Sequence, residues 1–336
     1  MAKHTSIWKA HMRPTSSSCG LVLLMLGVLG ACDSGPVEPT DAPAPSGPPG
    51  ITEPIGAQPP STPVSDPEPS GGFSEHIFLA KADGTVTAWL TEGGSPAWSP
   101  DGRKIAFRAS DGIRVMNADG SEVTQLVSGG NPTWSPDGTR IAFTSSAGIS
   151  ILDLGSLAVR TIVRRDFNEE TYKPWDMGVA GPAWSPNGAR IAFLHQGDGD
   201  MKPAQAYIVN SDGSNLRLLS PTINGGRYAE SDPSWSPDGS KIVYWMWRHG
   251  ISVINPDGGF PTPIYSSPYV VYGTRPVWSP DGRTIAFNYG RHSALALAIW
   301  TMSATGTNAR LLIPNAYDAA WSPDGAHIAF VRPRAD

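Results

Sequence analysis

Cysteine is almost absent from this sequence. The chain has 336 residues and two cysteines, Cys19 and Cys32, and both precede the part of the sequence that reads as a folded domain. No disulfide framework and no cysteine-based metal site is therefore available to that domain. Its stability has to come from side-chain packing and hydrogen bonds.

Charge is also scarce, at 16% of residues, and it carries no basic excess. Lys and Arg number 25 against 30 Asp and Glu, and three of the basic residues lie within the first thirteen positions, where no acid occurs. The rest of the chain is more acidic still. This balance argues against a phosphate-binding surface, so we expect no nucleic-acid partner.

Glycine and proline, by contrast, are abundant, with 37 and 33 residues. Together with the low charge, this composition favours many short strands joined by tight turns over long helices. We expect an all-β fold.

Residues 1–31 predict a signal peptide. The apolar run from Leu21 to Ala31 follows a basic stretch and is shorter than the roughly 20 residues that span a bilayer. Leu29-Gly30-Ala31-Cys32 resembles the bacterial lipobox, which implies lipidation of Cys32 and cleavage just before it. The alternative is an ordinary signal peptide cleaved elsewhere, and Met12 is an alternative start. We expect a lipid-anchored protein of the bacterial cell envelope, with the membrane and its side left open.

Residues 32–72 predict a tether. Positions 33–72 contain 12 Pro and six acidic residues, with no Lys, Arg or aromatic side chain. Such a segment buries too little apolar surface to offset its ordering entropy, and its prolines favour extended polyproline II conformations. We expect a disordered, semi-stiff spacer here; a proline-rich docking motif for a partner is the alternative.

A repeated pentapeptide dominates the rest of the chain. Trp-Ser-Pro-Asp-Gly occurs five times, and a sixth copy has Asn187 in place of the Asp; successive copies lie 36 to 51 residues apart. Self-similarity at such periods is typical of repeat folds whose units differ in loop length. Because the tryptophans recur regularly at strand ends, we expect them to pack the repeats together: Trp98, Trp134, Trp184, Trp235, Trp278 and Trp321.

Each copy predicts a turn between two strands. In the first copy, Pro100 presets the φ angle of the second turn position and Gly102 suits the left-handed conformation. A strand with alternating large and small side chains follows, such as Ile105-Ala-Phe107. A third strand and an Asp-Gly turn come next, as in Ile113–Gly120, and then a fourth strand. Each repeat is therefore a four-stranded meander.

The two ends of the repeat region complement each other. Residues 76–90 read as a third and a fourth strand with no pentapeptide before them, and the last copy stops after two strands, near Val331. Together they make one unit. We therefore predict a six-bladed β-propeller over residues 73–336, with the last blade closed by N- and C-terminal strands, which leaves no open sheet edge at the closure.

These repeats resemble the β-propeller of the TolB family, periplasmic proteins of the Tol-Pal system, and the WD-like repeats found beside prolyl oligopeptidase-type hydrolase domains. The resemblance covers roughly residues 76–331 and implies the propeller fold. TolB proteins also carry a separate N-terminal domain, whose place is taken here by the tether. The repeats specify fold far more than function.

Catalytic and metal-binding motifs are lacking. The sequence has no Gly-x-Ser-x-Gly elbow and no His-Glu-x-x-His motif, and the histidines show no compact ligand spacing. Asp198-Gly-Asp200 suits a solvated turn better than a cation site. We assign no catalytic residue, no metal and no cofactor.

The longest connections should share one propeller face, opposite the short turns. They are rich in aromatic and charged side chains, a mixture typical of recognition surfaces, although single members could instead pack between loops. The predicted binding face comprises Arg165, Tyr172, Trp175, His195, Asp198, Asp200, Tyr228, Trp247, Arg248, His249, Tyr269, Tyr272, Tyr289, Arg291 and His292.

Two functions follow from this pattern. The first is a monomeric, non-enzymatic scaffold, anchored in the envelope, that binds an envelope protein or peptide. The alternative is a propeller that binds or cleaves envelope or extracellular carbohydrate. Convergence of His195, His249, His292 and Arg248 around the axis at metal-binding distance would favour the enzyme.

Overall fold

A computed structural model describes residues 73–165, 178–196, 204–219, 231–246, 249–266, 275–290 and 297–335. The chain divides into two units, Met1–Glu53 and Pro54–Asp336, and all the described residues lie in the second. The predicted signal peptide, Cys32 and the tether fall outside the described residues. Nowhere in the described ranges is there a helix long and apolar enough to cross a membrane.

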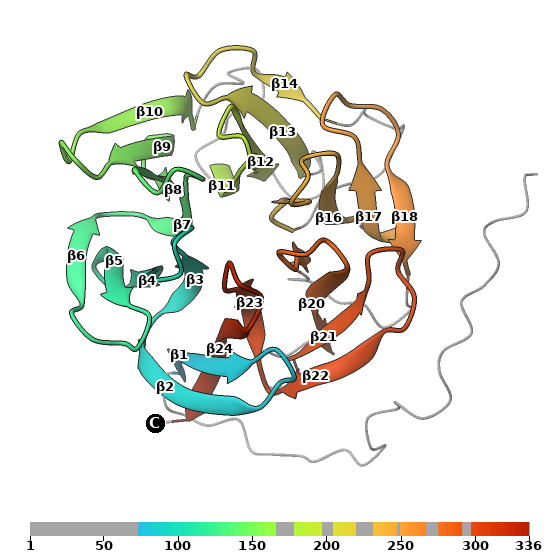
Figure 1. The fold of residues 1–336 in the computed structure, drawn as a ribbon. Coiled ribbons are helices and arrows are strands. Elements are labelled where there is room, and N and C mark those ends of the chain that lie inside the picture. Colours follow the sequence, from blue (N-terminus) through green and yellow to red (C-terminus); the bar gives the residue numbers. More distant parts are fainter. Residues whose placement is uncertain are drawn as a thin grey trace, which may run out of the picture. The chain divides into compact units, whose positions relative to one another are not determined.

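The described part is a six-bladed β-propeller, as predicted. Six antiparallel sheets of four strands each surround a common centre (Figure 1). Blades 1 to 3 comprise β3(Gly94–Trp98), β4(Lys104–Ala109), β5(Gly112–Asn117) and β6(Thr124–Val127); β7(Gly130–Trp134), β8(Arg140–Ser145), β9(Gly148–Asp153) and β10(Val159–Arg164); and β11(Gly178–Trp184), β12(Arg190–Gln196), β13(Gln205–Asn210) and β14(Arg217–Leu218).

The remaining blades complete the ring. Blades 4 and 5 comprise β15(Ser234–Trp235), β16(Ile242–Met246), β17(Gly250–Ile254) and β18(Thr262–Tyr265), then β19(Val277–Trp278), β20(Thr284–Gly290), β21(Leu297–Ser303) and β22(Arg310–Pro314). Blade 6 joins both ends of the chain: from the axis outward it consists of β23(Tyr317–Trp321), β24(His327–Ala335), β1(Phe73–Lys81) and β2(Val86–Glu92).

Blade 6 closes the ring as the sequence predicted. Strand β1 pairs with β24 over nine consecutive residues, from Phe73 opposite Ala335 to Lys81 opposite His327. Strand β1 is therefore paired with the C-terminal strand along its whole length, and β2 pairs with β1 on the outer side. In Figure 1 the blue strands β1 and β2 lie directly beside the red strands β23 and β24.

The repeated pentapeptides form the turns between the first and second strands. The N–H of Gly102 donates to the carbonyl of Ser99, and Gly102 has a φ of 71°, in the left-handed region. The hydroxyl of Ser99 donates to Asp101 at 2.6 Å, and the same carboxylate oxygen accepts the N–H of Arg103 at 3.1 Å. The serine and the aspartate thus form their hydrogen bonds within the turn itself.

Neighbouring blades interlock through the same pentapeptides. Pro323 of blade 6 lies against Gly102 of blade 1, Pro100 lies against Gly138, and the contact recurs around the whole ring. Several tryptophans also cross between blades, since the indole N–H of Trp98 donates to the carbonyl of Ala320 at 3.1 Å. The indoles of Trp98, Trp134 and Trp235 thus each link two neighbouring blades.

Apolar side chains fill the space between blades. Between blades 6 and 1, Ile77 and Leu90 from one sheet pack against Ile105, Phe107 and Met116 from the other, and all five are buried. The second strand of each blade supplies the central large residue of such a layer. Truncating one of these residues, such as Phe107 to Ala, typically costs about 3–5 kcal/mol.

Candidate binding site at the channel mouth

One equivalent position in each blade surrounds the central axis. It lies three residues before the repeated tryptophan, where the innermost strand begins, on the face opposite the pentapeptide turns. Unlike the turns, this position varies from blade to blade, and its occupants are Ser95, Asn131, Gly181, Asp232, Arg275 and Asp318. We call these six residues the mouth ring.

The backbone of the innermost strands directs the mouth ring toward the axis. Pairing is interrupted between Gly94 and Ala97, and corresponding breaks occur in β7, β11 and β23. Ser95, Asn131 and Asp318 have φ angles of 50°, 49° and 54°. Left-handed backbone is uncommon for residues other than glycine, and such bulges and strained positions cluster at functional sites.

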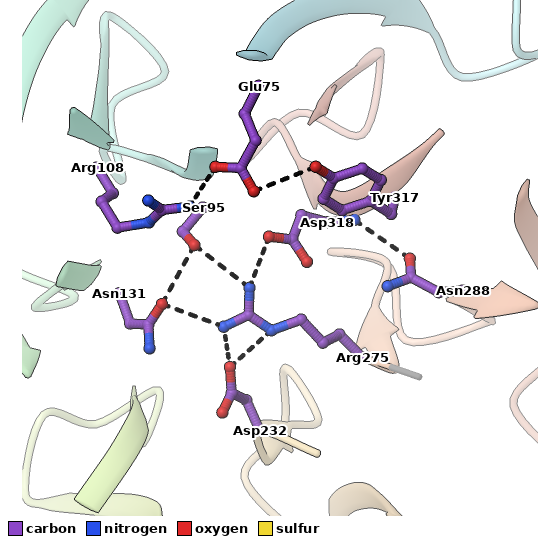
Figure 2. Close-up of polar contacts among 9 residues, drawn as sticks. All are labelled: Glu75, Ser95, Arg108, Asn131, Asp232, Arg275, Asn288, Tyr317 and Asp318. Carbon is purple, nitrogen blue, oxygen red and sulfur yellow. Dashed lines mark hydrogen bonds and ion pairs between the residues drawn. The ribbon is translucent and has the colours of Figure 1, made fainter. Parts of the chain in front are cut away.

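Arg275 lies at the centre of the ring and contacts four of its other members (Figure 2). Its Nε donates to Asp232 at 2.6 Å, and its Nη2 also pairs with that carboxylate. Its Nη1 donates to Asp318 at 2.8 Å. Longer contacts of 3.4 Å reach Ser95 from Nη1 and Asn131 from Nη2. These contacts match the five N–H donors of a guanidinium, so Arg275 is fully satisfied.

The ring is only partly open to solvent. The side chains of Arg275, Asp232 and Asp318 are 25%, 20% and 13% exposed. Two carboxylates surround one guanidinium, so the ring carries a net negative charge. A β-carbon at Gly181 would overlap the carboxylate of Asp232, which explains why this position of the ring is glycine.

A second polar group lies beside the ring, between blades 6 and 1. Glu75 accepts a hydrogen bond from the hydroxyl of Tyr317 at 3.1 Å, and its other oxygen pairs with Arg108. Burial, followed by the negative charge of Glu75, raises the pKa of Tyr317. This hydroxyl therefore stays protonated and acts as a donor. Asn288 also supports the ring by accepting the N–H of Asp318 at 3.2 Å.

The channel below the ring contains a cavity of about 340 Å³. Its wall consists of the innermost strands, including Pro96, Pro132 and Pro233, and it reaches Pro280 and Pro323 of the pentapeptide turns. The volume lies at the lower end of the range of ligand sites, which suits a small group or a few side chains.

Four of the predicted face residues lie within the described residues, and all four are at strand ends on the mouth side. His195 is buried in β12 and contacts the ring of Tyr207 edge to face at 6.1 Å. Tyr289 packs on Trp300 at 5.0 Å. His249 is exposed before β17, and the N–H of Arg165 donates to the carbonyl of Ala147 after β10. The contacts of His195 and Tyr289 are those expected of packing residues.

The other predicted residues lie outside the described residues: Tyr172, Trp175, Asp198, Asp200, Tyr228, Trp247, Arg248, Tyr269, Tyr272, Arg291 and His292. The proposed convergence of histidines with Arg248 therefore stays a prediction. Among the residues that the structure does describe, no three His, Cys, Asp or Glu side chains lie close enough to hold a metal ion.

The mouth ring itself was missed from sequence. None of its six residues belongs to the predicted binding face. A signal was present, because each lies three residues before a repeated tryptophan and all but Asp318 precede a proline. Comparing the repeats at each position, rather than reading loops one by one, would have found the ring.

Comparisons with known proteins agree with this architecture. A family model described as the TolB beta propeller domain matches residues 168–336. A TolB protein from Agrobacterium tumefaciens has a similar structure, with a TM-score of 0.62, 21% identity, and coverage of 79% of this chain and 100% of that chain. No curated protein sequence matches the chain.

Two further structures extend the comparison. TolB from Acinetobacter baumannii has a TM-score of 0.49 at 15% identity, and the match covers 79% of this chain but 64% of that one. A gluconolactonase from Xanthomonas campestris has a TM-score of 0.51 at 15% identity, with coverage of 76% of this chain and 89% of that chain. The identity to the gluconolactonase is low, so its TM-score of 0.51 shows a similar fold and carries no information about activity.

Proposed function

Because the chain belongs to the TolB beta propeller domain family, we propose that it is a cell-envelope lipoprotein whose propeller binds a protein or peptide partner at the channel mouth. The lipobox-like sequence ending at Cys32 supports the anchor, and residues 33–72 supply the spacer. In this proposal the protein is a monomer without enzymatic activity.

The mouth ring is the observation that carries this proposal. Six blades each direct one position toward the axis, and four of the residues there interact through Arg275. Prearranged polar groups above a cavity are typical of binding sites. Because Arg275 has no donor to spare and the ring is net negative, the ring favours a partner that presents hydrogen-bond donors or a positive charge.

Photo-crosslinking from the two propeller faces tests this proposal. p-Benzoylphenylalanine would replace Tyr289, beside the mouth, and in a matched variant Phe260, which is 76% exposed on the opposite face. Both changes replace one aromatic residue with another at the end of a blade. We expect a protein adduct in envelope membranes from position 289 and none from position 260.

Adducts from both positions equally, or from 260 alone, would contradict a partner at the mouth. No adduct from either, combined with turnover of a lactone or an oligosaccharide by the purified protein, would replace the scaffold with the carbohydrate enzyme. The anchor is tested separately: Cys32→Ala should abolish incorporation of labelled fatty acid and release the protein from membranes.

A further inference from the structure

Each blade has an equivalent row of three side chains across its second, third and fourth strands. In blade 6 this row is Phe330, Phe78 and Trp89, paired in register. The two phenylalanine rings stack at 5.8 Å, and Trp89 is 55% exposed at the rim. In the other blades the outer end of the row is Gln125, Thr161, Leu218, Pro263 or Leu311. An exposed tryptophan at the end of an aromatic row is peculiar to blade 6.

The next pair of residues toward the mouth side adds charge to this row. His76 lies opposite Arg332 in register, and its ring meets Trp89 edge to face at 6.3 Å. The guanidinium of Arg332 lies 5.6 Å from the Phe78 ring and 5.4 Å from the Phe330 ring. We call Trp89, Phe78, Phe330, His76 and Arg332 the blade-6 patch.

Part of the Arg332 guanidinium lacks a hydrogen-bond acceptor. Its one hydrogen bond goes from Nη2 to the carbonyl of Pro314 at 3.4 Å, and its Nε is buried without any acceptor. Among the described residues no carboxylate forms an ion pair with it, and desolvation lowers its pKa. A buried donor without an acceptor is costly, and more so on a charged group. The Glu92 carboxylate lies 3.9 Å from His76 at the edge of the patch, but no described carboxylate pairs with Arg332. The patch therefore has room for an anion on Arg332 and for an apolar group over Trp89.

The chain itself supplies both groups immediately before β1. Residues 66–69 read Asp-Pro-Glu-Pro, and Ser-Gly-Gly at 70–72 connects them to Phe73. Prolines dock well on aromatic side chains because their conformation is already restricted. No Lys or Arg occurs between residues 33 and 72, so nothing within that segment neutralises its acids.

The reach also fits. Phe73 and Arg332 belong to paired strands, and His76 lies three residues along β1 from Phe73. Phe78, which pairs with Trp89, lies five residues along β1 from Phe73, a span of at most about 18 Å. Residues 66 and 67 lie four to six residues before the two glycines, so a reversal there returns them to the level of the patch. A longer loop would not be needed.

We propose that residues 66–69 dock on the blade-6 patch, with a proline against Trp89 and the carboxylate of Asp66 or Glu68 on Arg332. Docking shortens the free spacer, because the spacer then ends near residue 65 rather than at Phe73. It also makes the patch unavailable to other acidic, proline-rich segments. This inference does not depend on the function proposed for the mouth.

Hydroxyl-radical footprinting with mass spectrometry tests the docking, because it reports the accessibility of single side chains. The secreted chain carrying Cys32→Ala would be compared with the same chain also carrying D66N/E68Q. We expect Trp89 to oxidise at least threefold faster in the D66N/E68Q chain, with Phe260 and Leu311 unchanged as internal references. The altered residues lie outside the blades, so the propeller should remain folded.

A matched control removes two charges farther upstream. E38Q/D41N changes the net charge equally, and we expect Trp89 to oxidise at the unaltered rate. Equal Trp89 oxidation in all three chains would overturn the proposal. Protection of Trp89 that disappears on dilution, regardless of residues 66 and 68, would also overturn it by assigning the patch to a second copy of the chain.

Discussion

The two ends of the innermost strands differ in how their polar groups are satisfied. At the turn end, the same Ser, Pro, Asp or Asn, and Gly recur in all six blades, and the serine and acidic side chains bond within their own turn. At the mouth end, the six positions hold five residue types, with Asp at two of them, and Arg275 bonds across blades. A turn whose hydrogen bonds all form within itself can be repeated unchanged in every blade. A network in which several blades bond to one guanidinium needs a donor at one position and acceptors at others.

The comparison predicts different energetics for the two ends. Changes in turns that are not neighbours around the ring should add, because such turns share no partners and do not touch. Changes in the mouth ring should not add, because one guanidinium serves four neighbours. The following predictions examine this difference, beginning with the largest expected effect.

Removing the central cation should destabilise the protein most. Arg275→Met keeps an apolar stem but leaves Asp232 and Asp318, both mostly buried, without their partner. Breaking a buried pair from one side typically costs 3–5 kcal/mol, and the partial exposure here places the expected loss near 3 kcal/mol. Urea unfolding followed by tryptophan fluorescence measures it.

A triple variant locates the origin of that loss. Adding D232N and D318N to R275M removes the repelling carboxylates, and we expect about half of the lost free energy of unfolding to return. If the triple variant loses as much free energy of unfolding as R275M, D232N and D318N lose in sum when made singly, the ring is not a coupled network.

Lowering the pH should destabilise the protein at the turn end, because the carboxylates of several turns become protonated. Hydrogen bonds from the preceding serine lower the pKa of each turn aspartate, and that of Asp238 falls to about 2. Because the folded pKa lies below the unfolded one, this stability is complete above the unfolded value near 3.8 and is lost as the pH falls toward 2. The thermal midpoint measured between pH 5 and pH 2 should fall, and D137N/D238N should flatten the decline.

A single turn should contribute about 1 kcal/mol. Asp137 accepts hydrogen bonds from Ser135, from the Thr139 N–H and from the Thr139 hydroxyl at 2.5, 3.0 and 2.8 Å. We expect D137A to lower the free energy of unfolding by about 1 kcal/mol. Asn187 is a neutral acceptor in the same place, bonded to Ser185 and the Ala189 N–H. N187A should therefore cost less than D137A in urea unfolding; an equal loss would mean that acceptor charge is unimportant.

The smallest effect should come from restoring the repeat. N187D converts the sixth copy to the sequence of the other five, and we expect a gain of a few tenths of a kcal/mol at neutral pH. The gain should shrink as the pH falls toward 2, where the equivalent carboxyl of Asp238 becomes protonated. A gain that persists in acid would have to come from something other than charge.

The fold could be predicted from sequence because its signals are local. Pro100 and Gly102 specify a turn, Ile105 and Phe107 specify the buried face of the next strand, and six repetitions multiply the evidence. The half-blades at the two ends then required pairing of β1 with β24, which the structure confirms. The mouth ring has a weaker signal, its fixed place before each repeated tryptophan, because its residues vary and a serine or an asparagine before a proline suits many loops.

The sequence by itself determined the number of blades, the turns and the closure, because those depend on the period of apolar residues and on the conformations that proline and glycine allow. Only the tertiary structure decided which side chains meet at the axis. Arg275 and Asn131 are 144 residues apart along the chain, and their contact exists because six blades curve around one centre. Trp89 is exposed for the same kind of reason: its row ends at the rim, where no neighbouring strand covers it.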